Sequence, residues 1–219
     1  LIRPTNALVD VLNQHKAKGV FFIDTTYLYR LIERKNNLCA SDLEKIETQL
    51  IALASNGHYL FHHLHPHWLD AQYIEDVNEW DLGNNQRFSF NDISIEERDA
   101  IFDFSVAFLK NIYFKAGISS YPDGYRAGGL FIEPFSVFAQ YFKKHQIKYE
   151  FSVVPGAVKK GDKLFYDFST AAKTPYVFED KVYETNKNGS FIQYPVSTIN
   201  ITGLIKFLNG VYYRLNKRA

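Results

Sequence analysis

The residues best suited to chemistry are histidines, and five of the seven fall within ten residues. The cluster comprises His58, His62, His63, His65 and His67. The last three alternate along the chain, so on an extended strand they would share one face. A turn at Pro66 would instead bring His63 and His67 together. Neutral imidazole is a favoured ligand of zinc and similar divalent ions, so the spacing predicts a metal site at His63 and His67, with His65 as a third member.

The other histidines have simpler interpretations. His58 directly follows Gly57 and is expected to be structural. His62 points opposite to His63 on a strand, so we expect it to be buried and hydrogen-bonded. His15 and His145 lie near the ends of predicted helices and are expected at the surface.

A second set of residues surrounds Arg126, which follows a Pro-Asp-Gly turn and precedes Gly128 and Gly129. Glycines permit close backbone approach, so the amides from Gly128 to Leu130 could face an acetyl oxygen and hold an oxyanion. The alternative is a tight turn with a surface arginine.

Two carboxylates are candidates for catalysis. Asp24 ends the apolar run at 20–23 and is the best visible third metal ligand. Its alternative role is the N-cap of a helix beginning at Thr25. Glu150 could pair with Arg126, or could be an outward-facing strand residue.

Aromatic and polar side chains follow the histidines in a long segment, 68–91. Trp68 and Trp80 can stack on the C–H faces of sugar rings, with core packing as the alternative. Possible contacts to sugar hydroxyls come from Asp70, Asp81, Asn84, Asn85 and Arg87. We interpret the segment as a loop over a site.

Strands and helices that alternate along the chain must position these groups. The pattern predicts helices over 5–19, from a capping box at 41–44 to Asn56, from a capping box at 94–97 to Gly117, and over 135–144 and 204–215. Leu8, Val9 and Leu12 should face inward. Strands are predicted at 20–23, 59–64, 124–126, 148–154 and 192–196, the first of them buried on both faces. This order indicates an α/β fold with a parallel sheet or barrel in one domain, 1–219.

Composition narrows the function classes. Lys and Arg number 25 against 24 Asp and Glu, and this near balance argues against nucleic-acid binding. The longest apolar runs are far shorter than a membrane span, and a single cysteine excludes an internal disulfide framework. We expect a cytoplasmic protein.

Two segments together resemble the polysaccharide deacetylase family, the NodB-homology group. They are 57–68 (GHYLFHHLHPHW) and 124–130 (GYRAGGL). The run at 20–24 (VFFID) is similar to the family's second strand, and 149–156 (YEFSVVPG) to a later strand of a subgroup from bacterial surface-polysaccharide clusters. The similarity in order and spacing covers most of 5–196.

The resemblance implies a distorted, incomplete parallel β/α barrel and metal-dependent removal of acetyl groups from sugars or a polysaccharide precursor. It implies that His63 and His67 form the His-x-x-x-His ligand pair, and that Arg126 orients the catalytic carboxylate. The family's first-strand Asp pair and its late Leu-x-His motif are not visible here. We therefore expect an opening strand with the third, carboxylate ligand before Leu1.

Two other functions stay open. One is a metal-dependent phosphoesterase or amidohydrolase that uses the His-x-His of His63 and His65, although such enzymes carry this motif on their first strand. The other is a non-catalytic carbohydrate-binding protein on the same fold, which the missing Asp pair favours.

Overall fold

Two of the predicted apolar runs form neighbouring parallel strands that bring the site residues together. In this computed structural model, β1 (Val20–Asp24) pairs in parallel with β2 (Tyr59–Leu64), and Asp24 lies beside His63 in the register. The structure describes residues 2–83, 86–161, 165–198, 203, 205, 209, 210 and 212. Most of the helix predicted over 204–215 lies outside the described residues.

The remaining elements are arranged along the chain as follows. The helices are α1 (Ile2–Gln14), α2 (Thr25–Arg34), α3 (Asn37–Ser55), α4 (Ile95–Lys115) and α5 (Ser136–His145). The short 3-10 helices are η1 (Pro66–Asp70), η2 (Phe90–Asp92) and η3 (Gly128–Leu130). The other strands are β3 (Gln72–Ile74), β4 (Glu79–Asp81), β5 (Gly124–Ala127), β6 (Tyr149–Glu150), β7 (Val158–Lys159), β8 (Tyr166–Asp167), β9 (Tyr176–Phe178) and β10 (Phe191–Gln193).

The main sheet has the strand order β1-β2-β5-β6-β10-β9. Every neighbouring pair from β1 to β10 is parallel, and only the β10–β9 pair is antiparallel. The prediction of parallel pairing among the strands at 20–23, 59–64, 124–126 and 149–153 is therefore confirmed. The chain has an α/β fold whose parallel strands end at a common edge of the sheet, where their loops can build a site.

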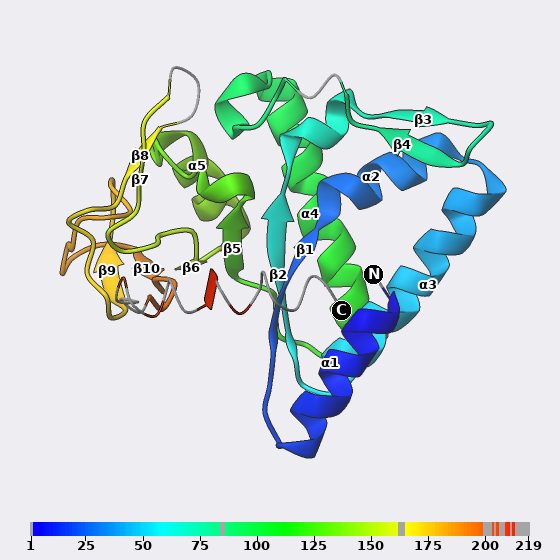
Figure 1. Ribbon diagram of the computed structural model, residues 1–219, viewed down its shortest axis with the longest axis horizontal. Coiled ribbons are helices and arrows are strands. Elements are labelled where there is room, and N and C mark those ends of the chain that lie inside the picture. Colours follow the sequence, from blue (N-terminus) through cyan, green and yellow to red (C-terminus); the bar gives the residue numbers. More distant parts are fainter. Residues whose placement is uncertain are drawn as a thin grey trace.

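The two faces of this sheet differ in what covers them. Helices α2, α3 and α4 pack on β2 from one side, and they lie together beside β1 and β2 in Figure 1. The other face presents a row of apolar side chains: Val20, Phe22, Tyr59, Phe61, Phe151 and Tyr194. Val20 is 45% and Tyr59 53% exposed. The expectation that the strand at 20–23 is buried on both faces is therefore wrong, because a continuous apolar run does not reveal whether a second layer exists.

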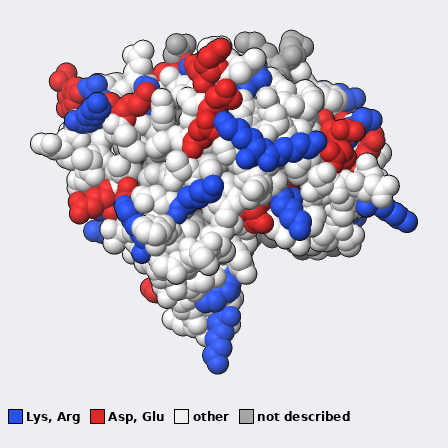
Figure 2. Space-filling model, turned by 180° about the vertical axis from the view of Figure 1, so that it is seen from behind, with Lys and Arg blue, Asp and Glu red and all other residues white. Residues whose placement is uncertain are grey.

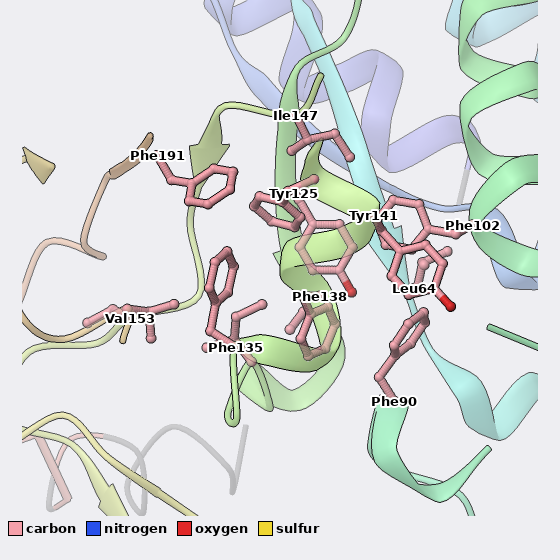
Figure 3. Close-up of a cluster of buried hydrophobic side chains, with 14 of the residues drawn as sticks. Leu64, Phe90, Phe102, Tyr125, Phe135, Phe138, Tyr141, Ile147, Val153 and Phe191 are labelled. Atoms are coloured by element: carbon pink, nitrogen blue, oxygen red, sulfur yellow. The ribbon is translucent and has the colours of Figure 1, made fainter. Parts of the chain in front are cut away.

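The largest core cluster is aromatic and joins α4 and α5 to the middle strands. Tyr125 of β5 packs between Phe102 of α4 and Phe142 of α5, with ring centroids 5.6 and 5.4 Å away. Figure 3 shows Tyr125 and Phe102 within this cluster. Phe135 and Phe191 surround the other side of Phe142, at 5.2 and 5.6 Å. Much of the high aromatic content therefore serves packing.

Replacing Phe142 by alanine should destabilise the protein by about 3–5 kcal/mol, because the fully buried ring would leave a cavity that its neighbours cannot fill. The matched control is Phe114→Ala on α4, whose ring is 81% exposed and whose loss should change stability by less than about 0.5 kcal/mol. Urea unfolding measures both. Equal losses in the two variants would contradict this description of the core.

Helix starts show where local signals succeed and fail. The capping box at Ser94 and Glu97 forms as predicted and opens α4. The box predicted at 41–44 does not open a helix, because α3 already begins at Asn37. There the Asn36 side chain accepts a 2.7 Å hydrogen bond from the Cys39 amide. On α1, Leu8 is 52% exposed rather than inward, since only one edge of that helix packs against α3.

Three other predictions were incomplete. The segment 68–91 contains the antiparallel β3–β4 hairpin as well as loop. The strands predicted over 148–154 and 192–196 shorten to β6 and β10. Strands β7, β8 and β9 were not predicted, because they are two or three residues long and lack a periodic apolar pattern.

The surface carries charges of both signs. Lys and Arg are interspersed with Asp and Glu over the face seen in Figure 2, in keeping with the balanced composition. In the described part of the chain, no helix has the length and apolarity to cross a lipid bilayer.

Candidate functional site

Three histidines meet where β2 ends. His63 is the fifth residue of β2, His65 follows the strand, and His67 lies in η1, which begins at Pro66. The His65 ring lies between the other two, with centroids 4.4 Å from His63 and 4.9 Å from His67. The turn at Pro66 and the grouping of His63, His65 and His67 are thus present, with His65 at the centre of the group.

Asp24 joins this group from the end of β1. Its Oδ2 accepts hydrogen bonds from His65 Nδ1 and Trp68 Nε1, both at 2.8 Å. Its Oδ1 is buried and has no hydrogen-bond partner among the described residues. Asp24 occupies the position before α2, but its side chain makes no capping bond. The carboxylate therefore serves the histidine cluster rather than the helix.

The hydrogen bonds of two histidines leave their second nitrogens as acceptors. His63 Nδ1 lies 2.7 Å from the Arg126 carbonyl, which can only accept, so Nδ1 carries the proton and Nε2 the lone pair. His65 Nδ1 donates to Asp24 in the same way. Burial, more than the neighbouring His65, lowers the pKa of His63, and burial likewise lowers the pKa of His67. Both rings are therefore neutral near pH 7, the form that binds metals.

The donor types fit a divalent cation. His63 and His65 each have one ring nitrogen in an orienting hydrogen bond, which leaves the other nitrogen as an acceptor. Together with the buried Oδ1 of Asp24, these are acceptor atoms to which no described residue donates. Their geometry does not yet form a metal site. Within the described residues, no three His, Cys, Asp or Glu side chains are close enough to hold a metal ion as they stand. Three of these ligand atoms would have to converge on binding.

Arg126 lies on β5 directly beside His63 in the register. Its guanidinium carbon is 5.3 Å from the Phe22 ring centroid, and the side chain lines a groove of about 310 Å³ on the sheet face opposite to α2, α3 and α4. None of the described Asp or Glu side chains is within ion-pairing distance of it. The guanidinium is therefore available to an acidic group that enters this groove.

The glycines after Arg126 allow the strands to approach closely. A Cβ on Gly128 would lie 2.5 Å from the Leu64 carbonyl oxygen and 2.7 Å from His65 Cδ2. Gly129 and Leu130 follow with positive φ angles of 60° and 69°. Gly128 therefore approaches the histidine strand closely, whereas the approach of the 128–130 amides to an acetyl oxygen stays a prediction.

Glu150 does not pair with Arg126, and that expectation is wrong. It stands opposite Tyr125 in the β5–β6 register, so it lies on the sheet face opposite to Arg126. It is fully buried, its two carboxylate oxygens accept from the Ser152 amide at 2.9 and 2.8 Å, and burial raises its pKa to about 7. The alternative, an outward-facing residue, is wrong as well. Glu150 is a buried carboxyl that braces β6.

The two tryptophans occupy different places. Trp68 lies beside the cluster, with its ring 5.8 Å from His67. Trp80 packs on the β3–β4 hairpin and α2, with its ring 5.2 Å from Tyr73 and 5.9 Å from the Arg30 guanidinium carbon. Of the two, Trp68 is placed to contact a ligand of the histidines.

The predicted polar contacts of the long loop are mostly satisfied internally. Arg87 bridges Asp70 at 2.6 Å and Glu97 of α4 at 2.5 Å, so both loop residues hold the loop on the helix. Asp81 caps its own turn through the Gly83 amide at 2.7 Å. Asn84 and Asn85 lie outside the described residues.

Three of the remaining histidines behave as expected. His62 is fully buried, with Nδ1 2.9 Å from Ser105 Oγ and Nε2 3.0 Å from the Pro122 carbonyl. His58 accepts from the Gly19 amide at 3.0 Å, and His15 is exposed. His145 is not a surface residue, because its ring stacks on Phe102 at 5.7 Å and its side chain is 11% exposed.

His62 should make folding sensitive to acid. Burial lowers its pKa from 6.5 to about 3, so the unfolded chain binds a proton that the folded protein excludes. Its contribution is fully present above pH 6.5 and is lost as the pH falls toward 3, by several kcal/mol in all. A His62→Gln variant should be less stable at neutral pH yet depend less on pH.

Urea midpoints measured across this pH range test the point. The control is His15→Gln on the exposed end of α1, which should keep the wild-type pH dependence. If the His62 and His15 variants have the same slope, His62 is not the titrating group.

Two further residues near the site were not predicted. Phe88 lies with its ring 6.5 Å from His67, and Phe131 lines a small internal space together with Phe88 and Gly128. Neither residue stands in a motif, and each comes near the site only through the path of its loop.

No family model, no curated protein and no solved structure matches this chain. The similarity to deacetylases therefore rests on the sequence motifs described above.

Proposed function

We propose that this protein is a metal-dependent hydrolase that removes acetyl groups from N-acetylated sugars or a polysaccharide precursor, on a distorted, incomplete β/α barrel. One observation carries the proposal. His63, His65 and His67 meet Asp24 at the ends of two parallel strands, where unpaired acceptor atoms have no donor of their own. Such an acceptor-rich group is the chemistry of a cation site.

In this proposal His63 and His67 hold the ion, zinc by preference, and His65 or Asp24 contributes next. When bound, a divalent cation polarises the acyl carbonyl and activates water. The Arg126 carbonyl and the Asp24 carboxylate keep His63 and His65 in their ligand tautomers. Trp68 fixes the Asp24 carboxylate from the other side.

Arg126 supports the reaction through its charge. The guanidinium lies on the same sheet face as His63 and has no carboxylate partner among the described residues. It can hold the general base ionised, or bind an acidic group of the substrate. The backbone from Gly128 to Leu130 follows immediately and can help to hold the oxyanion.

Aromatic side chains make a sugar the best substrate class. Trp68 borders the histidines, and Phe22, Phe61 and Phe151 lie on the sheet face that carries Arg126, with ring centroids 5.3–6.3 Å apart. Sugar rings present C–H faces to such surfaces while their hydroxyl and amide groups reach polar ends of a site.

Acetate release from a panel of N- and O-acetylated sugars tests the proposal, with added zinc, cobalt or manganese. We expect turnover that a chelator abolishes and that metal restores. Glycan binding without acetate release under any metal would replace the enzyme by a carbohydrate-binding protein. Hydrolysis of phosphate esters instead would keep the metal and overturn the substrate.

A further inference from the structure

A cavity of about 660 Å³ lies beside Phe131, and its lining contains none of the residues used above for catalysis. It is formed by η2 and the segment before it, by the chain after η3, and by β8. Its walls include Ser89, Asn91, Phe131, Glu133, Asp167 and Tyr183. The volume is typical of a small-molecule site.

Glu133 gives this cavity an unsatisfied charge. Its Oε1 is buried and has no hydrogen-bond partner among the described residues, while the Val182 amide donates to the carboxylate. Burial raises the pKa of Glu133 to about 7. A carboxyl in this state binds a donor that brings positive charge, because such a ligand repays the desolvation of the ionised form.

The other walls also favour a cation. Asp167 adds a second carboxylate, and none of the described lining residues is Lys, Arg or His. Two lysines lie near these walls without lining the cavity: Lys159 Nζ is 5.2 Å from the Phe131 centroid, and Lys181 Nζ is 5.9 Å from that of Tyr183. The charge of Lys181 partly opposes the effect of burial on the pKa of Glu133. Aromatic faces combined with carboxylates recognise organic ammonium ions.

We infer that this cavity binds an amino sugar through its free, protonated amine, with Glu133 as the principal partner. The hydroxyl and amide side chains of Ser169, Thr170 and Asn91 line the same cavity and suit the sugar hydroxyls. The ring of Phe131 offers a surface for the C–H face of the sugar.

The position of the cavity suggests what amine binding does for the enzyme, and this step rests on the proposed function. Ser89 lines the cavity, and the preceding residue, Phe88, has its ring 6.5 Å from that of His67. The cavity and the histidines therefore border the same loop, and we infer that one oligosaccharide reaches both. Chains that already carry one free amine would bind better than fully acetylated chains.

Calorimetric titration of the whole protein with glucosamine, N-acetylglucosamine and glucose tests the inference. At a pH just above the pKa of Glu133, glucosamine should bind at least about tenfold more tightly than either neutral sugar. Glu133→Gln keeps the size of the side chain and should abolish that difference. The matched control is Glu33→Gln, because Glu33 is an exposed carboxylate on α2 that pairs with Arg30, does not line the cavity and should leave the difference intact.

A second variant guards against misfolding of Glu133→Gln. Asp167→Asn, on the separate strand β8, should reduce the preference for glucosamine partly. Equal affinity for the three sugars, or an unchanged preference in both cavity variants, overturns the inference. The outcome is separable from the proposed function, since amine binding without acetate release rejects only the enzyme, and acetate release without amine preference rejects only this cavity.

Discussion

Replacing His63 and His67 together by alanine should remove the bound metal and lower acetate release by at least about a hundredfold. Both rings are half-buried and neutral near pH 7, and His63 is already oriented by the Arg126 carbonyl. Water molecules in place of the two histidine rings would bind the metal more weakly and would not hold it in position. Elemental analysis of protein purified without chelators measures the metal, and the acetate assay measures the rate.

The control for this double variant is His15→Ala, which removes an exposed histidine near the end of α1. It should keep full metal content and activity. A His65→Ala variant adds a further test, because it removes one of the two 2.8 Å partners of Asp24 Oδ2 and leaves the other, Trp68 Nε1, in place. Equal metal content in the double variant and the wild type would refute a site at His63 and His67.

Replacing Arg126 by glutamine should lower the rate of acetate release on the order of a hundredfold while the metal content stays unchanged. The guanidinium stands beside His63 in the sheet register, whereas it is the backbone carbonyl of the same residue that contacts the histidine. The substitution therefore removes the charge and keeps the contact that orients His63. The measurements are kcat, KM and metal content of the same preparations.

The dependence of the rate on pH shows whether Arg126 acts through its positive charge or only through its place in the structure. None of the described Asp or Glu side chains pairs with Arg126, so a base that it holds ionised would have to enter the groove. If such a carboxyl serves as the base, the loss of Arg126 should move the acidic limb of the rate profile to higher pH, because the carboxyl then binds its proton more readily. Arg126→Lys should restore part of the rate, and Arg3→Gln on the exposed face of α1 should change nothing. A parallel loss of metal in Arg126→Gln would assign the residue to the metal site instead.

Local sequence signals predicted those parts of the fold that depend on neighbours along the chain. The strand at 59–64 and the capping box at Ser94 were found because their pattern and their contacts lie within a few residues. Asn36 displaced the box at Ser41 because an earlier cap was available and the residues between them sustain a helix. The residues at 41–44 alone do not reveal that an earlier cap will start the helix.

Features that depend on distant contacts were not predictable. The orientation of Glu150 follows from its register against Tyr125, which local spacing does not determine. The exposure of Val20 and the partial exposure of the rest of β1 depend on what packs on the sheet rather than on the composition of the strand. The residues near the histidines were predicted from their types, whereas the hydrogen bonds of Asp24 to His65 and Trp68 join residues 41 and 44 positions apart.

The hydrogen bond from Trp68 to Asp24 also makes the site visible to light. The chain has only two tryptophans, Trp68 and Trp80, and their rings lie 6.0 Å apart. All of its tryptophan fluorescence therefore comes from Trp68, which is hydrogen-bonded to Asp24, and from the ring that contacts Trp68. Any ion that draws charge from Asp24 changes the field on the Trp68 indole directly. The intensity and wavelength of the native fluorescence should therefore titrate with metal, with no label attached to the protein.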